Sequence, residues 1–410
     1  MSGHGDEPPP PGELAGLFRV ETVRYDDDTV VYLGAPVAQP RTAVEQLRPT
    51  FRERGYSLSL EHRPDAAVHA DRQSEQFGPR SDRSSTVREP GIGDAVRSSY
   101  ALVAEPTDTG TSVPWLNVVL LLATIASTLY VGASGWYYIP VTEQPLRIFE
   151  AWPFVVAMLG VLGIHELGHY VAARYHGVDV TLPYFIPFPS LLGTMGAVIN
   201  IRGHIPSRRA LFDIGVAGPL AGLVATVVVT VVGLTLDPVQ VPESVRSGGA
   251  QYAINFNDPL LLQAIEALVN ALGMGVTYGP TEAVHPVVFA GWAGMFFTFL
   301  NLLPVGQLDG GHIVRAIVGR RQETVAAAVP GGLFALAGAL YLTQDAPPIG
   351  FGVWTLWVFW GLVSTGLAYA GPATPTVDER LDRRRVAVGV ATFALGVACF
   401  TPVPFEIVAA

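Results

Sequence analysis

From residue 114 onward the chain is dominated by apolar stretches long enough to cross a bilayer as helices. A span needs about 20 apolar residues. Half of the 410 residues are hydrophobic and 15% are charged, whereas about a quarter of a soluble chain is charged. The sequence predicts an all-α polytopic membrane protein with about six to seven transmembrane helices. The expected spans are residues 114–133, 151–175, 210–235, 286–304, 323–343, 351–371 and 386–404.

Residues 1–112 differ from the rest because they contain no long apolar run. Short alternating segments and one helical pattern predict a small α+β domain, interrupted by a disordered insertion at 64–96. Its expected strands are Phe18–Val23, Thr29–Leu33, Tyr56–Glu61 and Ser99–Val103, and its expected helix is Ala43–Arg54. The first twenty residues have neither a basic region nor an apolar core, so we expect no cleavable signal peptide. The expected organisation is thus 1–112, a membrane domain at 113–375, and a C-terminal span at 376–410.

Basic residues are unevenly placed, and all 25 are arginine. The loops 134–150, 236–285 and 344–350 hold only Arg147 and Arg246. The positive-inside rule therefore puts the arginine-rich loops and the N-terminal domain in the cytoplasm of a multi-pass cell-membrane protein. The arginines on that side are Arg174, Arg202, Arg208, Arg209, Arg315, Arg320, Arg321, Arg380, Arg383, Arg384 and Arg385. The net charge of −10 argues against a nucleic-acid partner.

Two segments between the spans are unusual. Residues 181–206 are apolar but contain Pro183, Pro187 and Pro189, so they cannot form a straight helix. Thr194–Ile201 alternates weakly, which predicts a strand in a re-entrant β-hairpin packed against protein. Residues 259–272 predict an amphipathic surface helix whose apolar face holds Leu261, Ile265, Leu268 and Leu272.

The second expected span contains His165-Glu166-Leu167-Gly168-His169. Histidines four residues apart lie on nearly the same helix face and can bind one Zn²⁺, while the adjacent glutamate can take a proton from water. A random HExxH is expected in roughly one such chain per hundred. Three ionisable groups inside a membrane span are costly, however, and are seldom kept without a function. The sequence therefore predicts a metal site with His165 and His169 as ligands and Glu166 as the general base. His165 lies about 14 residues, or roughly 20 Å, along an inward-running span, so the site should lie toward the cytoplasm.

A catalytic zinc needs a third protein ligand and an open position. Asp309 is the best candidate, because Pro304, Gly306 and the following glycine pair should unwind the chain there. Asp309 could instead cap the helix that follows it. His312 is a rival ligand, although we favour a structural or supporting role for it. The single cysteine, Cys399, excludes a cysteine-based zinc site and an intramolecular disulfide.

The two motifs HELGH and NLLPVGQLDGGH together resemble those of the site-2 protease family of intramembrane metalloproteases, peptidase family M50. The resemblance covers roughly 114–343 and includes AGPLAG at 217–222 and GTMGAVI at 193–199. It implies one Zn²⁺ per chain, held by His165, His169 and Asp309, with Glu166 as the base. The chain resembles members that lack a PDZ-like insert and a regulatory nucleotide-binding (CBS) module.

The resemblance also implies how a substrate would be held. Asn301 would contact the substrate backbone, and residues 193–201, including Gly193, Thr194 and Gly196, would pair with an unwound substrate helix. The expected partners are a single-pass or regulatory membrane-protein substrate and the lipid bilayer, while the oligomeric state is open.

Two other classes of function remain. A non-catalytic scaffold could keep a structural zinc, but such a site would not need Glu166. A metal or ion transporter could use the same groups, but transporters usually show repeated halves, and the sequence holds no second copy of HELGH or LDGG. The apolar spans exclude a soluble zinc protease.

Overall fold

The computed structural model describes residues 7–26, 29–37, 39–62, 100–106, 114–202, 205–247, 252–344, 352–375 and 379–409. The insertion expected at 64–96 lies outside these ranges. The chain divides into two compact units, Met1–Val113 and Pro114–Ala410.

The N-terminal unit is built on a four-stranded antiparallel sheet with strand order β1-β2-β4-β3. In β2, Val30 and Tyr32 are buried and their neighbours are not, which is the two-residue period of a strand with one face on a core. Phe51 of α2 packs edge-on against the Tyr32 ring. The predicted strands and helix are therefore present. Their bounds are β1 (Phe18–Asp26), β2 (Thr29–Pro36), β3 (Tyr56–His62), β4 (Tyr100–Pro106), α1 (Pro11–Leu14) and α2 (Pro40–Glu53).

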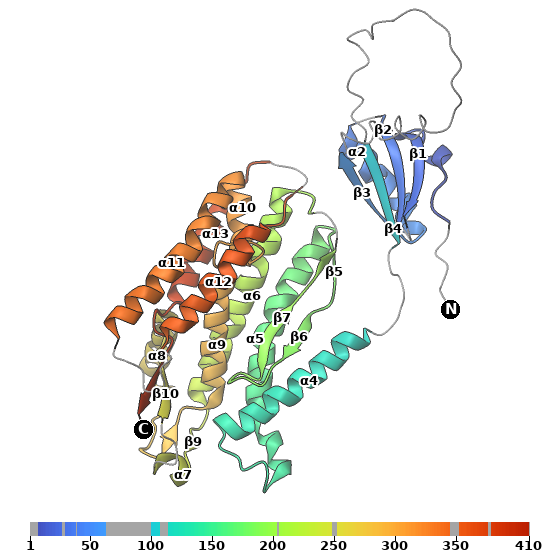
Figure 1. Ribbon diagram of the computed structural model, residues 1–410. Helices are drawn as coiled ribbons and strands as arrows, with labels where there is room; N and C mark the ends of the chain where they lie inside the picture. The colour runs from blue at the N-terminus through green and yellow to red at the C-terminus, as the bar shows by residue number, and fades with distance from the viewer. Residues whose placement is uncertain are drawn as a thin grey trace, which may run out of the picture. The chain divides into compact units, whose positions relative to one another are not determined.

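The second unit is mostly helical (Figure 1). Its long helices are α4 (Trp115–Val131), α5 (Trp152–Tyr175), α6 (Arg208–Thr235), α9 (Pro286–Asn301), α10 (Asp309–Val318), α11 (Gln322–Thr343), α12 (Trp354–Ala370) and α13 (Arg383–Ala398). Its shorter helices are α7 (Glu243–Arg246), α8 (Leu260–Ala271), η1 (Gly132–Trp136), η2 (Pro145–Ala151) and η3 (Gly319–Arg321).

Within the described ranges, four continuous helical stretches are long and apolar enough to cross a membrane. They are Trp115–Trp136, Pro145–Tyr175, Arg208–Thr235 and Asp309–Thr343. The chain is therefore a multi-pass membrane protein. Three of the seven expected spans correspond to shorter helices, because α9 and α13 have 16 residues and α12 has 17.

Helices α5, α6 and α9 form the centre of this unit. They share one apolar core in which Phe154, Met158, Leu223, Phe289 and Met295 are buried. A Cβ placed on Gly294 of α9 would lie 2.6 Å from the Thr226 hydroxyl of α6, so these two helices approach closely. The centre of the unit is thus a tightly packed helix layer rather than a loose bundle.

A β-hairpin connects α5 to α6. Strands β6 (Tyr184–Pro187) and β7 (Thr194–Val198) pair antiparallel, and β5 (Asp179–Val180) pairs with β8 (Ile201–Arg202) at its base. Helix α4 and the η1 turn that follows it each hold this hairpin at one point. The Asn117 amide donates to the carbonyl oxygens of Leu182 and Pro183 at 2.9 and 3.0 Å, and Trp136 Nε1 donates to the Leu191 carbonyl at 2.8 Å.

One expectation about local structure was wrong. The expected span 386–404 ends early, because α13 stops at Ala398 and β12 (Phe405–Ala409) then pairs with β10 (Tyr252–Phe256). The helix predicted at 259–272 is present as α8. On its predicted apolar face Ile265 is buried against the protein, while Leu268 and Leu272 are exposed. The remaining pair in this region joins β9 (Val239–Gln240) to β11 (Glu282–Ala283).

Candidate metal centre

Three side chains from two helices converge at one point in the helical unit. His165 Nε2 lies 3.1 Å from Asp309 Oδ2, and His169 Nε2 lies 3.2 Å from Asp309 Oδ1. The two imidazole nitrogens are 3.2 Å apart. Both histidines are buried, and within the described ranges this is the group of His, Cys, Asp and Glu side chains that could hold a metal ion. The structure thus brings together the three ligands that the sequence predicted.

The spacing of these atoms fits a small cation. Ligand atoms arranged tetrahedrally at about 2.0–2.1 Å from zinc are separated by roughly 3.3 Å. Catalytic zinc sites commonly use two histidine nitrogens and one carboxylate as ligands, and they keep a fourth coordination position for water or substrate. The residues present therefore fit Zn²⁺.

The orientation of His169 supports the same reading. Its Nδ1 lies 2.8 Å from the backbone carbonyl oxygen of Ile214 in α6. A carbonyl oxygen can only accept, so Nδ1 must carry the proton, and in the neutral ring Nε2 presents a lone pair toward His165 and Asp309. A hydrogen bond of this kind to the outer nitrogen is typical of metal-binding histidines.

Two glycines of α6 make room for the imidazoles. A Cβ on Gly218 would collide with the ring of His169, and a Cβ on Gly222 would lie 2.8 Å from His165 Nδ1. Both glycines belong to the AGPLAG segment at 217–222. The zinc helix α5 can thus lie against α6 only because these two positions carry no side chain.

Asp309 reaches the histidines from the turn between α9 and α10. Helix α9 ends at Asn301, and α10 begins with Asp309 itself, preceded by Leu308 as the N-cap residue. The carboxylate contacts the two imidazoles, and the N-cap position is occupied by Leu308 rather than by Asp309. The alternative that Asp309 merely caps the helix is therefore wrong.

Glu166 is buried on the same helix, beside the two histidines. The backbone N–H of Ile199, which lies just after β7, is close to its carboxylate. The segment that follows the hairpin strand is thus a neighbour of the glutamate. Glu166 thus lies near the three predicted ligands without being one of them, and its role as the base stays a prediction.

Asn301 and His312 lie close to the three ligands. The Asn301 amide nitrogen is 3.3 Å from His165 Nε2. His312 is buried in α10 and does not join the metal-binding group, and its Nδ1 has no hydrogen-bond partner among the described atoms. The substrate contact expected for Asn301 stays a prediction.

The hairpin residues expected to bind substrate have local roles that can be seen directly. Gly193 has φ +75° and approaches the Thr128 backbone of α4 so closely that a Cβ would collide. Thr194 is buried, and its hydroxyl donates to the Ile186 carbonyl at 3.0 Å and accepts from the Gly196 N–H at 3.0 Å. These contacts fix the hairpin, and a role in substrate binding is not tested by them.

Sequence reasoning missed three contributors to the site. Gly218, Gly222 and the Ile214 carbonyl all come from α6, which carries no ligand. The AGPLAG segment was a visible signal for the two glycines. Nothing in the sequence marks a backbone carbonyl.

Comparison with known proteins agrees with this geometry. The model of peptidase family M50 matches residues 153–342. The chloroplastic "Probable zinc metalloprotease EGY1" of Arabidopsis thaliana is 34% identical over 261 residues, covering 56% of this chain and 45% of that protein. The chloroplastic EGY2 protein of the same plant, also described as a probable zinc metalloprotease, is 31% identical over 247 residues, covering 60% of this chain and 40% of that protein.

A solved structure, the site-2 protease from Methanocaldococcus jannaschii, covers 64% of this chain and 93% of its own at 14% identity and a TM-score of 0.32. The chain spans less than half the length of the plant relatives. The sequence match from Pro153 to Leu342 includes all three converging side chains and the glutamate beside them, and it is this segment of the chain that matches peptidase family M50.

Proposed function

We propose that the chain is an intramembrane zinc metalloendopeptidase that hydrolyses peptide bonds in or near transmembrane segments of other membrane proteins. The observation that carries the proposal is the convergence of His165, His169 and Asp309 inside a helix layer, with Glu166 beside them. The plant relatives named as zinc metalloproteases support it.

Each residue has a definite task in this proposal. His165, His169 and Asp309 hold the zinc, and the Ile214 carbonyl keeps His169 in the ligating tautomer. Zinc would polarise the scissile carbonyl and make water more acidic. Glu166 takes a proton from the attacking water and returns it to the leaving amine, and the Ile199 N–H lies close to its carboxylate.

The hairpin provides a place for the substrate backbone. A transmembrane helix hides its peptide groups in internal hydrogen bonds, so the substrate must unwind before cleavage. Strand β7 pairs with β6 on one side, and within the described ranges no strand pairs with its other edge. Addition of the unwound substrate to residues 193–201, with Gly193, Thr194 and Gly196 shaping the strand, would satisfy the exposed groups. Asn301 would contact the substrate beside the metal.

The finer arrangement in the membrane is also part of the proposal. About six to seven helices span the bilayer, and the β6–β7 hairpin is re-entrant. The N-terminal domain (1–112), the arginine-rich loops and the metal centre face the cytoplasm of the cell membrane. Residues 113–375 form the protease domain and 376–410 the last span. The expected substrate is a single-pass or regulatory membrane protein.

The test separates a protease from a zinc-holding scaffold. The full chain in lipid nanodiscs is incubated with a panel of fluorescent single-pass transmembrane peptides, and cleavage and zinc content are both measured. We expect cleavage by the wild type, and a Glu166→Gln variant that keeps its zinc but loses roughly 10²–10⁴-fold in rate. Asp309→Ala should lose both zinc and cleavage. Equal cleavage by wild type and Glu166→Gln would reject the proposed base. If the zinc-loaded wild type left every peptide intact, the scaffold reading would be favoured instead.

A further inference from the structure

Two grooves lie on either side of Asp213, near the N-terminal end of α6. The first runs between α5 and α6, has a volume of about 530 Å³, and is walled by Ile164, Leu167, Val171 and Ala217. Ile164, Leu167 and Val171 are 45%, 50% and 59% exposed, on a helix apolar enough to span a membrane. Its occupant must therefore be apolar.

The second groove runs between α6 and the start of α13 and has a volume of about 660 Å³. Phe212, Val216 and Val388 form its apolar wall, and three consecutive arginines, 383 to 385, also line it. One groove is thus apolar, the other is partly cationic, and Asp213 borders both.

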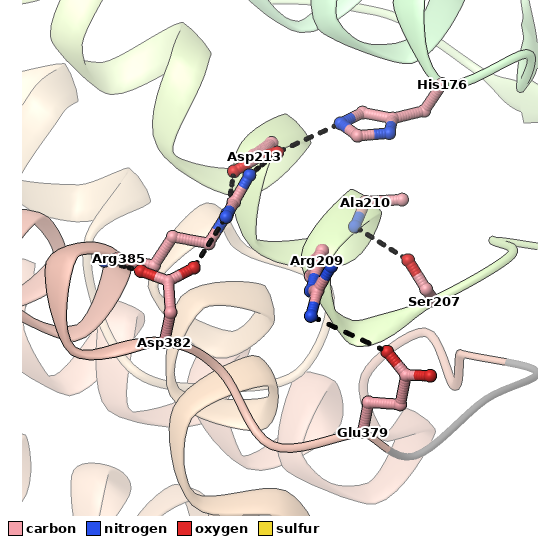
Figure 2. Close-up of polar contacts among 8 residues, drawn as sticks. All are labelled: His176, Ser207, Arg209, Ala210, Asp213, Glu379, Asp382 and Arg385. Atoms are coloured by element: carbon pink, nitrogen blue, oxygen red, sulfur yellow. Dashed lines mark hydrogen bonds and ion pairs between the residues drawn. The ribbon is translucent and has the colours of Figure 1, made fainter.

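The acidic groups in this region contact basic side chains, as Figure 2 shows. Arg385 donates to both Asp213 oxygens at 2.8 and 2.9 Å and to Asp382 at 2.6 Å. His176, the C-cap residue that follows α5, lies 3.0 Å from Asp213. Arg209 lies 3.9 Å from Glu379.

Arg383 and Arg384 are different. Both are exposed, and neither guanidinium forms an ion pair with a residue in the described part of the chain. Arg385 is shared between Asp213 and Asp382, so the three arginines and two aspartates that line the second groove carry a net charge of +1, and Arg383 and Arg384 are the cationic groups left for a ligand. Guanidinium groups are the donors best suited to phosphate oxygens.

We propose that this site binds an anionic phospholipid of the leaflet that the arginines face. Its phosphate lies on Arg383 and Arg384, and one acyl chain lies in the groove between α5 and α6. A free inorganic anion would use the arginines but leave the apolar groove unfilled. A transmembrane helix from a second copy would fill the apolar groove but leave the two arginines unneutralised. A lipid complements both features, since basic residues at a membrane surface attract anionic head groups.

The position of the site gives it a link to the metal centre. The apolar groove includes Leu167 and Gly168, which lie between the two predicted zinc ligands His165 and His169. The bound chain would cover the exposed side of the zinc helix next to α6. This inference does not depend on catalysis, because lipid binding can be measured without a substrate.

The experiment uses the full chain purified in detergent. Its thermal unfolding is followed while phosphatidylglycerol, phosphatidylcholine or inorganic phosphate is added, and retained lipid is identified by native mass spectrometry. We expect stabilisation by phosphatidylglycerol and retention of an anionic lipid.

Arg383→Gln/Arg384→Gln should bind phosphatidylglycerol about 25-fold more weakly, since each arginine near an anionic surface contributes a factor of about five. The matched control Arg320→Gln/Arg321→Gln removes two exposed arginines outside the groove and should bind as wild type.

A second variant tests the apolar groove separately. Ala172→Phe places a ring in the groove and should weaken phosphatidylglycerol binding without changing the arginines. Equal shifts with phosphatidylglycerol and phosphatidylcholine, or equal weakening in the two double-arginine variants, would overturn the proposal. A phosphate shift as large as the lipid shift would show a simple anion site. If Ala172→Phe instead converted a dimer to a monomer in sedimentation, a second copy would be the occupant and the lipid assignment would be wrong.

Discussion

His169 Nδ1 donates a 2.8 Å hydrogen bond to the carbonyl oxygen of Ile214, one turn before Gly218 and two turns before Gly222, the glycines that face the histidine rings. Helix α6 therefore shapes the metal centre without contributing a ligand. It fixes the tautomer of one imidazole and leaves space for both. The first prediction follows from that space.

Gly218→Ala should reduce zinc affinity about 10–100-fold, the loss typical when groups that orient metal ligands are disturbed. The added methyl would occupy the position of the His169 ring, so the ring must turn away from Asp309. Competition with a fluorescent chelator measures the affinity. Gly160→Ala is the control, because a Cβ at that position of the zinc helix meets nothing within 4 Å. Unchanged affinity in Gly218→Ala would show that the ring is not held as described.

Asp309→Asn should lower zinc affinity by at least about tenfold while leaving the fold intact. The amide keeps the shape of the side chain but removes the negative charge that faces His165 and His169. Zinc content after dialysis and the far-UV circular dichroism spectrum are the two measurements. A variant that retained zinc like the wild type would exclude Asp309 as a ligand.

The Arg385–Asp213 pair should couple α13 to α6. Both side chains are partly exposed, at 33% and 26%, and the contact is bidentate, so we expect a coupling of up to about 1 kcal/mol. Thermal unfolding of Arg385→Gln, Asp213→Asn and the double variant forms the double-mutant cycle that measures it. Strictly additive effects would mean that the contact contributes nothing to stability.

The N-terminal unit should lose stability at high pH through one tyrosine. Burial raises the pKa of Tyr32 to about 12 from its ordinary 10.0, while its hydroxyl donates to the Pro9 carbonyl at 2.6 Å. The folded state therefore keeps a proton that the unfolded state gives up. The contribution of protonated Tyr32 to the free energy of unfolding is fully present below pH 10 and is lost as the pH rises from 10 toward 12. Phenolate absorbance compared between wild type and Tyr32→Phe isolates this group. An ordinary titration near pH 10 would contradict the burial.

Asn117→Ala should loosen the hairpin. The variant loses the two hydrogen bonds that α4 donates to the carbonyls at the start of β6. Amide hydrogen exchange in residues 184–198 should become faster, by local rather than global opening. Ser134→Ala is the matched control in the adjoining π-helix, because its hydroxyl bonds only to the Tyr130 carbonyl one turn before it. Equal exchange in Asn117→Ala and wild type would mean that other contacts hold the hairpin.

The metal centre was largely predictable because its ionisable residues lie in segments that are otherwise apolar. Ionisable side chains in an apolar span stand out in a sequence, and a four-residue spacing on a helix fixes which of them meet. Asp309 could be chosen for a similar reason, since the glycines and proline around it end a helix at membrane depth.

The parts that could not be predicted depend on relations between helices. Nothing in the sequence of α8 showed that Leu262 rather than Leu268 would be buried, because both faces are apolar. The end of α13 was missed because β12 is stabilised by pairing with β10, about 150 residues earlier in the chain. The two partners of Asp213, His176 and Arg385, come from segments far from it in the sequence, so these contacts could not be predicted either.

The distance in sequence between the metal-binding groups bears on how the protein is made. His165 and Asp309 are 144 residues apart, and α6, the hairpin and α9 all lie between them. A nascent chain that has inserted its HELGH helix still lacks the carboxylate. The centre cannot assemble until the turn after α9 has been synthesised and docked. During biosynthesis the chain therefore passes through the translocation machinery without a working site, and any peptidase activity can begin only once the protein core is complete.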